Sequence, residues 1–102
     1  MERRLKFQEE LEALDVGQVY YQPPASVRMT FPCIVYENEG FDSKSANNRN
    51  YIITNRYSVT YISKDPETEL VIRKILRAFE SVSHDRHYVS ENLNHEVFTI
   101  FY

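Results

Sequence analysis

Three histidines and a neighbouring carboxylate near the end of the chain are the residues best suited to chemistry: His84, Asp85, His87 and His95. Imidazole and carboxylate are common ligands of zinc and related metals, so a metal-dependent hydrolase is one interpretation. In a regular strand, however, His84 points away from both Asp85 and His87. No cysteine pair and no HExxH motif accompanies them. We therefore predict surface or hydrogen-bonded structural histidines and no metal site.

Other routes to catalysis find less support. Cys33 lies in an apolar run, where a thiol is normally inert packing. Gly17 and Gly40 are the only glycines, which excludes a glycine-rich phosphate loop. Neighbouring carboxylates such as Glu9 and Glu10 fall on an expected helix surface, where solvated side chains are usual. We predict no catalytic residue and no cofactor.

Composition narrows the class of protein further. A chain of 102 residues with 42% hydrophobic content is expected to form one ordered domain. The formal net charge of -3 disfavours binding to nucleic-acid phosphates. A module that stacks bases on its tyrosines remains an alternative. One cysteine allows no intrachain disulfide, and the charged start "MERRLKFQEE" is not that of a signal peptide, so we expect a cytoplasmic protein without a membrane span.

The helices and strands that must position these residues are predicted from the spacing of apolar residues and from capping and turn residues. We expect a helix over 2–14 with Phe7, Leu11 and Leu14 on its buried face, then an apolar strand around 33–36. A polar loop, flexible when free, is expected over 38–50, and a long strand over 51–63. A second helix should begin after the N-cap Asp65 and reach Val82. Strands over 85–90 and 95–102, joined by a turn, complete a single-domain α+β fold with two helices on a mostly antiparallel sheet.

Several apolar side chains lie where a single chain does not obviously cover them. Leu5 and Leu70 each fall on the polar side of a predicted helix. The closing segment "VFTIFY" is apolar on both of its alternating faces, so a second layer must cover it. A neighbouring copy of the chain is the natural covering layer, and we predict self-association.

The order of these segments resembles a known group of proteins. The stretches "VYYQPPASVRMTFPCIVYE", "YIITNRYSVTYISKDPE" and "HDRHYVSENLNHEVFTIFY", separated by a polar loop and a helix, are similar to small neck and tail-completion proteins of long-tailed phages and prophages of Gram-positive bacteria. The similarity is greatest to the tail terminator family, and it covers nearly the whole chain. An adjacent head-completion or connector protein of the neck is the alternative.

The resemblance implies a structural, non-enzymatic protein without cofactor. Tail terminators form a ring, usually a hexamer, at the head-proximal end of the tail tube, where they stop tube polymerisation and join the head. The implied partners are other copies of the chain, the major tail tube protein and the head-completion protein, while DNA only passes through the lumen. The implied location is the host cytoplasm during assembly and then the virion. We assign ring contacts to Leu5, Leu70, Phe98, Phe101 and Tyr102, and contacts with the tube or connector to Phe41, Asp42, Lys44 and Arg49.

Overall fold

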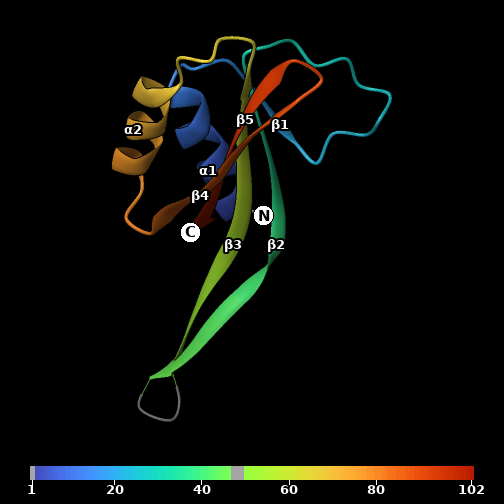
Figure 1. Cartoon of the computed structure of the whole chain (residues 1–102). Helices are drawn as coiled ribbons and strands as arrows, with labels where there is room; N and C mark the ends of the chain where they lie inside the picture. The colour runs from blue at the N-terminus through green and yellow to red at the C-terminus, as the bar shows by residue number, and fades with distance from the viewer. Residues whose placement is uncertain (1, 47–49) are drawn as a thin grey trace.

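The computed structural model describes residues 2–46 and 50–102 as two helices packed on a five-stranded sheet (Figure 1). This confirms the predicted α+β class with a mostly antiparallel sheet. The elements in chain order are α1 (Glu2–Ala13), β1 (Gln18–Tyr21), β2 (Cys33–Ala46), β3 (Asn50–Ser63), α2 (Glu69–Ala78), β4 (Val82–Ser90) and β5 (Leu93–Phe101).

The sheet has the strand order β1-β2-β3-β5-β4, so β5 lies inside the sheet. Only β1 and β2 run parallel, and every other neighbouring pair is antiparallel. The turn predicted between the last two strands is confirmed. Glu91 and Asn92 both have positive φ, of 53° and 64°, as a two-residue hairpin turn requires.

Both helices cover the same face of the sheet, and the core lies between the two layers (Figure 1). The predicted α1 stripe of Phe7, Leu11 and Leu14 is buried. The Phe7 ring stacks on Tyr57 at a centroid distance of 4.3 Å and meets the edge of Tyr36 at 5.4 Å. Such aromatic contacts add to the hydrophobic effect of burial, which makes Phe7 the central side chain of this layer.

The alternation along β5 shows which sheet face is fully covered. Asn94, Glu96, Phe98 and Ile100 are buried toward the helices, and the residues between them are only half-buried. The two helices therefore cover one face of β5 completely. Its other face, which was also expected to need a covering layer, is only half-buried within the chain.

The second helix is shorter than predicted. It begins at Glu69 with Thr68 as N-cap, and it ends at Ala78, so Val82 belongs to β4. Asp65 instead forms a local turn in which its Oδ1 accepts a hydrogen bond of 2.9 Å from the backbone N–H of Glu67. Asp followed by Pro is typical of both turns and helix starts, which explains the error.

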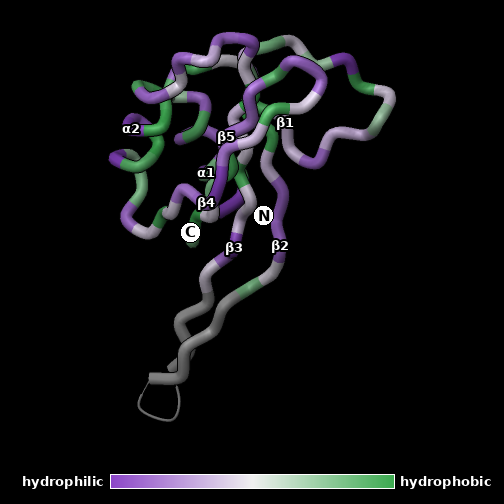
Figure 2. Tube along the Cα trace, viewed as in Figure 1, coloured by the Kyte–Doolittle hydropathy of each residue, from purple (hydrophilic) through white to green (hydrophobic). Residues whose placement is uncertain are grey.

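The predicted loop over 38–50 is also wrong over 38–46 and at residue 50, and its residues 47–49 lie outside the described part of the chain. In the described residues, β2 continues to Ala46 and β3 begins at Asn50, with pairs running from Gly40–Arg56 to Ala46–Asn50. This β2–β3 hairpin projects from the body of the molecule (Figure 1), and β2 is hydrophilic near the body and hydrophobic where its coloured part ends (Figure 2). A polar sequence without a regular period therefore forms paired strands over the described residues of this hairpin.

Candidate functional site

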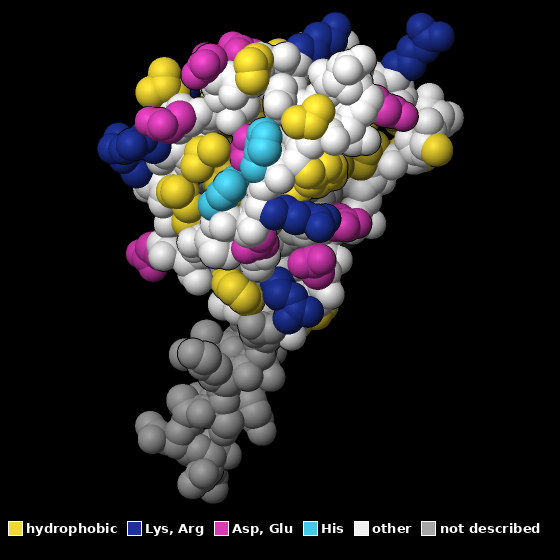
Figure 3. All heavy atoms as spheres, viewed as in Figure 1, with side chains coloured by type: hydrophobic (Ala, Val, Ile, Leu, Met, Phe, Trp, Pro, Cys, Tyr) yellow, Lys and Arg dark blue, Asp and Glu magenta, His cyan; other side chains and the backbone are white. Residues whose placement is uncertain are grey.

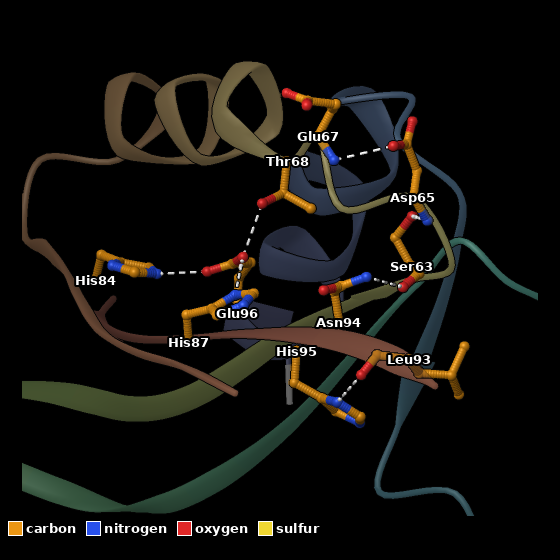
Figure 4. Close-up of polar contacts among 10 residues, drawn as sticks. All are labelled: Ser63, Asp65, Glu67, Thr68, His84, His87, Leu93, Asn94, His95 and Glu96. Carbon is orange, nitrogen blue, oxygen red and sulfur yellow. Dashed lines mark hydrogen bonds and ion pairs between the residues drawn. The ribbon is translucent and has the colours of Figure 1, made fainter. Parts of the chain in front are cut away.

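The most polar buried site is centred on Glu96 of β5, whose exposed fraction is 1%. Three side chains converge on its carboxylate (Figure 4). The Thr68 hydroxyl donates to Oε2 at 2.7 Å, and Nε2 of His84 donates to Oε1 at 2.8 Å. Nδ1 of His87 donates to Oε2 at 2.5 Å. The site therefore joins the start of α2 to both strands of the β4–β5 hairpin.

A β-bulge brings the two histidines to the same face of β4. His84 pairs with Phe98 and His87 pairs with Glu96, two positions on the same face of β5. The register shifts between His84 and Arg86, which leaves Asp85 as the extra residue on β4. The prediction that His84 and His87 point to opposite faces is wrong, because strict alternation fails across a bulge.

The other two predicted ligands lie elsewhere. Asp85 accepts hydrogen bonds from the hydroxyls of Ser83 and Thr99, outside the Glu96 site. The His95 ring stacks on Tyr88 at 4.5 Å, and its Nδ1 lies 3.1 Å from the carbonyl oxygen of Leu93. The four residues singled out from the sequence thus form no common site.

Sequence reasoning missed Glu96, although a signal for it exists. Glu96 shares its strand face with Phe98 and Ile100, so alternation alone places a carboxylate on an apolar, helix-facing surface. A buried carboxylate requires hydrogen-bonding partners, and the histidines of β4, the strand that pairs with β5, can supply them.

Burial and hydrogen bonding act in opposite directions on the charge state of Glu96. Burial by itself raises the pKa of this carboxyl group, but the hydrogen bonds from Thr68, His84 and His87 outweigh it. The Glu96 pKa is therefore lower than its ordinary value of 4.5, and the group is ionised at neutral pH. Both histidines reach the surface, with exposed side-chain fractions of 29% for His84 and 45% for His87.

The arrangement holds the charge of Glu96 among hydrogen-bond donors. Both imidazole nitrogens that face the site donate to carboxylate oxygens and do not converge on a shared ligand position. Across residues 2–46 and 50–102, no group of three His, Cys, Asp or Glu side chains has a geometry that could hold a metal ion. What this site does within the chain is to fix α2 against β4 and β5.

The predicted ring contacts divide into exposed and buried residues. Leu5 and Leu70 are exposed, at 52% and 80% of their surface. Phe98 has no exposed surface and belongs to the core, so it is withdrawn from the proposed contact set. Phe101 is half-buried. Tyr102 packs on the core, and its hydroxyl donates a hydrogen bond to the Glu10 carboxylate.

The predicted tube or connector contacts all fall in or next to the β2–β3 hairpin. Phe41 lies on β2 with 67% of its surface exposed. Asp42 and Lys44 belong to the same strand, and only their backbone is described. Arg49 lies outside the described residues.

A shallow groove of about 600 Å³ separates the end of α1 from α2. Val16, Tyr61 and Val71 contribute its apolar lining. Lys and Arg side chains gather over α2 on the left of Figure 3, where they border the groove: Arg73, Lys74 and Arg77. The groove thus combines an apolar floor with a basic border.

No model of a known protein family matches this sequence, and no curated protein is significantly similar to it. Among the described residues, neither helix has the length and apolar content needed to cross a membrane. A function must therefore be inferred from the geometry above together with the resemblance seen in the sequence.

Proposed function

We propose that the protein is a structural assembly protein of the tail terminator type, whose copies form a ring at the head-proximal end of a phage tail tube. The observation that carries this proposal is the projecting β2–β3 hairpin. Fold and resemblance are consistent with the proposal, and the exposed leucines supply further contact surface.

The hairpin lacks the support that strands receive inside a sheet. β1 pairs with β2 only over Cys33–Tyr36, and β5 pairs with β3 only from Arg56 onward. Over 40–46 and 50–54, the described backbone pairs of the two strands therefore join them only to each other, and the support from the body ends at Asn55, whose carbonyl oxygen accepts a hydrogen bond from the N–H of Tyr102. A two-stranded hairpin is marginally stable alone in water, and its open edges can pair with other chains. The projecting part of the β2–β3 hairpin, called the arm below, would be stabilised by another protein that covers it. This favours a role in assembly.

In the proposed assembly, the compact body forms the ring and the arm reaches the next component. The longest dimension of the molecule is 50 Å, against 29 and 23 Å for the others, so the arm extends well beyond one subunit body. Its partner is the tail tube protein or the head-completion protein. The Glu96 site has a structural role in this assignment, no cofactor takes part, and DNA passes through the lumen without being bound.

Two alternatives give different experimental results. A connector protein elsewhere in the neck would bind the head-side component and not tube ends. A metal-dependent hydrolase would need His84, Asp85, His87 and His95 around one metal ion, and the structure does not bring these four side chains together. Stoichiometric zinc retained after dialysis, and lost in the His87→Ala variant, would favour the hydrolase.

The first test is light scattering behind size exclusion over a concentration series, followed by negative-stain imaging alone and with purified tail tubes. We expect rings of hexamer size and density at one end of each tube. Monomers at every concentration that also fail to decorate tubes would refute the proposal.

The role of the arm is tested separately with Phe41→Ser. Because Phe41 is exposed, its replacement is expected to change the free energy of unfolding by less than about 0.5 kcal/mol. It should nevertheless weaken tube binding at least tenfold. Val89→Ser is the matched control, since Val89 is 61% exposed on β4 and remote from the hairpin. Equal tube binding by both variants would remove the arm from the contact.

A further inference from the structure

The two helices carry exposed faces of opposite charge, each with a leucine in it. The acidic face of α1 consists of Leu5, Glu9 and Glu12, all of them exposed. The basic face of α2 consists of Leu70, Arg73, Lys74 and Arg77, also all exposed. Their spacings, i, i+4, i+7 and i, i+3, i+4, i+7, place each set on one side of its helix.

Both faces point away from the core of their own chain. On α1, Phe7 and Leu11 are buried on the opposite side of the helix, and on α2 the buried residue is Ile75. Within the described part of one copy, no salt bridge joins the acidic face to the basic face. Both faces are therefore open to a second chain.

Most of the charged side chains on these two faces form no salt bridge within the described part of the chain. Among the described residues, Glu9, Glu12, Lys74 and Arg77 form no salt bridge. Arg73 forms one with Glu69, at 3.2 Å between exposed side chains in the i, i+4 relation. Exposed pairs of this kind contribute only a few tenths of a kcal/mol, so this one does not prevent a second contact. Asp15 lines the groove beside the basic face but leaves a positive excess there.

We propose that the acidic face of α1 in one copy binds the basic face of α2 in another copy, with Leu5 and Leu70 at the centre of the contact. This inference deepens the proposed function, on which it rests, by naming a contact between subunits. Leucines of 52% and 80% exposure provide the apolar centre, and the charged side chains form the rim. If two copies each bind the other's basic face through their acidic faces, they form a two-fold dimer. If each copy binds one neighbour through its acidic face and another neighbour through its basic face, the copies can close into a ring.

The decisive experiment exchanges charge between the two faces. Glu9→Lys/Glu12→Lys makes both faces basic, and Lys74→Glu/Arg77→Glu makes both faces acidic. Each variant alone is then self-repelling, and we expect its self-association to weaken at least tenfold in sedimentation and light scattering. An equimolar mixture restores complementary charges at every contact, so we expect it to regain assemblies of wild-type size. High salt should dissociate both the mixture and the wild type.

The control separates specific pairing from attraction between oppositely charged proteins. Glu37→Lys/Glu91→Lys makes the same change in net charge at exposed positions on β2 and in the β4–β5 turn. Mixed with the Lys74→Glu/Arg77→Glu variant, it should not restore that variant to closed assemblies of wild-type size, because every contact through the variant's acidic α2 face still repels. Circular dichroism and thermal melting check the fold of each protein. Leu5→Ser and Leu70→Ser test the apolar centre without changing charge, and each should weaken association at least tenfold.

The outcomes distinguish this contact from the proposed function. Wild-type rings with charge variants that assemble normally would overturn the contact and leave ring formation standing. A mixture that fails to recover assembly would also overturn the contact. So would a result in which only the Lys74→Glu/Arg77→Glu variant, and not the Glu9→Lys/Glu12→Lys variant, loses self-association. A wild-type chain that stays monomeric and does not decorate tubes would reject both proposals.

Discussion

Replacing Glu96 with Gln tests whether the buried carboxylate holds α2 on the β4–β5 hairpin. The substitution keeps the shape of the side chain and removes its charge. The amide oxygen of Gln can still accept a hydrogen bond. Its NH₂ group, however, is itself a donor and would face groups that donate to the carboxylate in the wild type. Thr68 is buried, so its hydroxyl cannot turn to water, whereas the exposed sides of His84 and His87 can hydrate.

The expected loss follows from these contacts. A hydrogen bond to a charged group contributes about 1.5–3 kcal/mol, and a neutral one about 1 kcal/mol. Since the histidines recover part of their loss through water, we expect Glu96→Gln to lower the free energy of unfolding by about 2–3 kcal/mol at pH 7. Thr68→Val is the matched variant. It removes one hydrogen bond to the charged carboxylate and should cost about 1.5–3 kcal/mol.

The pH dependence gives the same experiment a second, independent readout. The folded Glu96 pKa lies below 4.5, so the native carboxylate remains ionised where the unfolded one takes up a proton. Its contribution is fully present above pH 4.5 and is lost as the pH falls through the lower, folded pKa. Urea unfolding from pH 7 downward should therefore show the two proteins converging in stability at acid pH. A difference at pH 7 below about 0.5 kcal/mol, or one independent of pH, would refute this explanation.

Two further predictions concern the backbone near β2 and the aromatic core. Gly17 has φ of 141°, and a Cβ there would lie 2.3 Å from the carbonyl oxygen of Pro32, so Gly17→Ala should lower stability by more than about 2 kcal/mol in thermal unfolding. An unchanged melting midpoint would contradict it. Burial and the Glu10 carboxylate raise the Tyr102 pKa from 10 to about 12, so its contribution is present below pH 10 and is lost as the pH rises through 12. Tyr102→Phe should remove this alkaline component from the pH profile of stability, and identical profiles would argue against it.

The parts of the fold set by local periodicity were predictable from the sequence. The α1 stripe repeats at helical spacing, and the alternating residues of β3 occur on a strand, because in both cases one face is buried in the core. Gly17 also lies just beyond α1 as expected, although Asp15 is the first residue there with positive φ, at 54°.

The errors arise where distant contacts override a local signal. The start of α2 depends on Thr68, whose hydroxyl bonds Glu96, 28 residues away, and not the helix end. Among the described side chains at the base of the β2–β3 hairpin, residues 40, 41, 54 and 55 do not belong to the core cluster, and the polar sequence of the hairpin has no period that predicts a strand. The bulge at Asp85 depends on pairing between β4 and β5, and periodicity within one strand cannot reveal an inserted residue.

The position of β5 has a consequence for how the chain is made. β5 is the last strand in chain order, yet it pairs with both β3 and β4 and contributes Phe98 and Ile100 to the core. During synthesis, α1 and β1 to β4 can emerge before the strand that joins them exists. Until then the apolar surfaces of β3 and α2 stay open, so a ribosome that stalls before residue 98 leaves an aggregation-prone chain for chaperones or proteases.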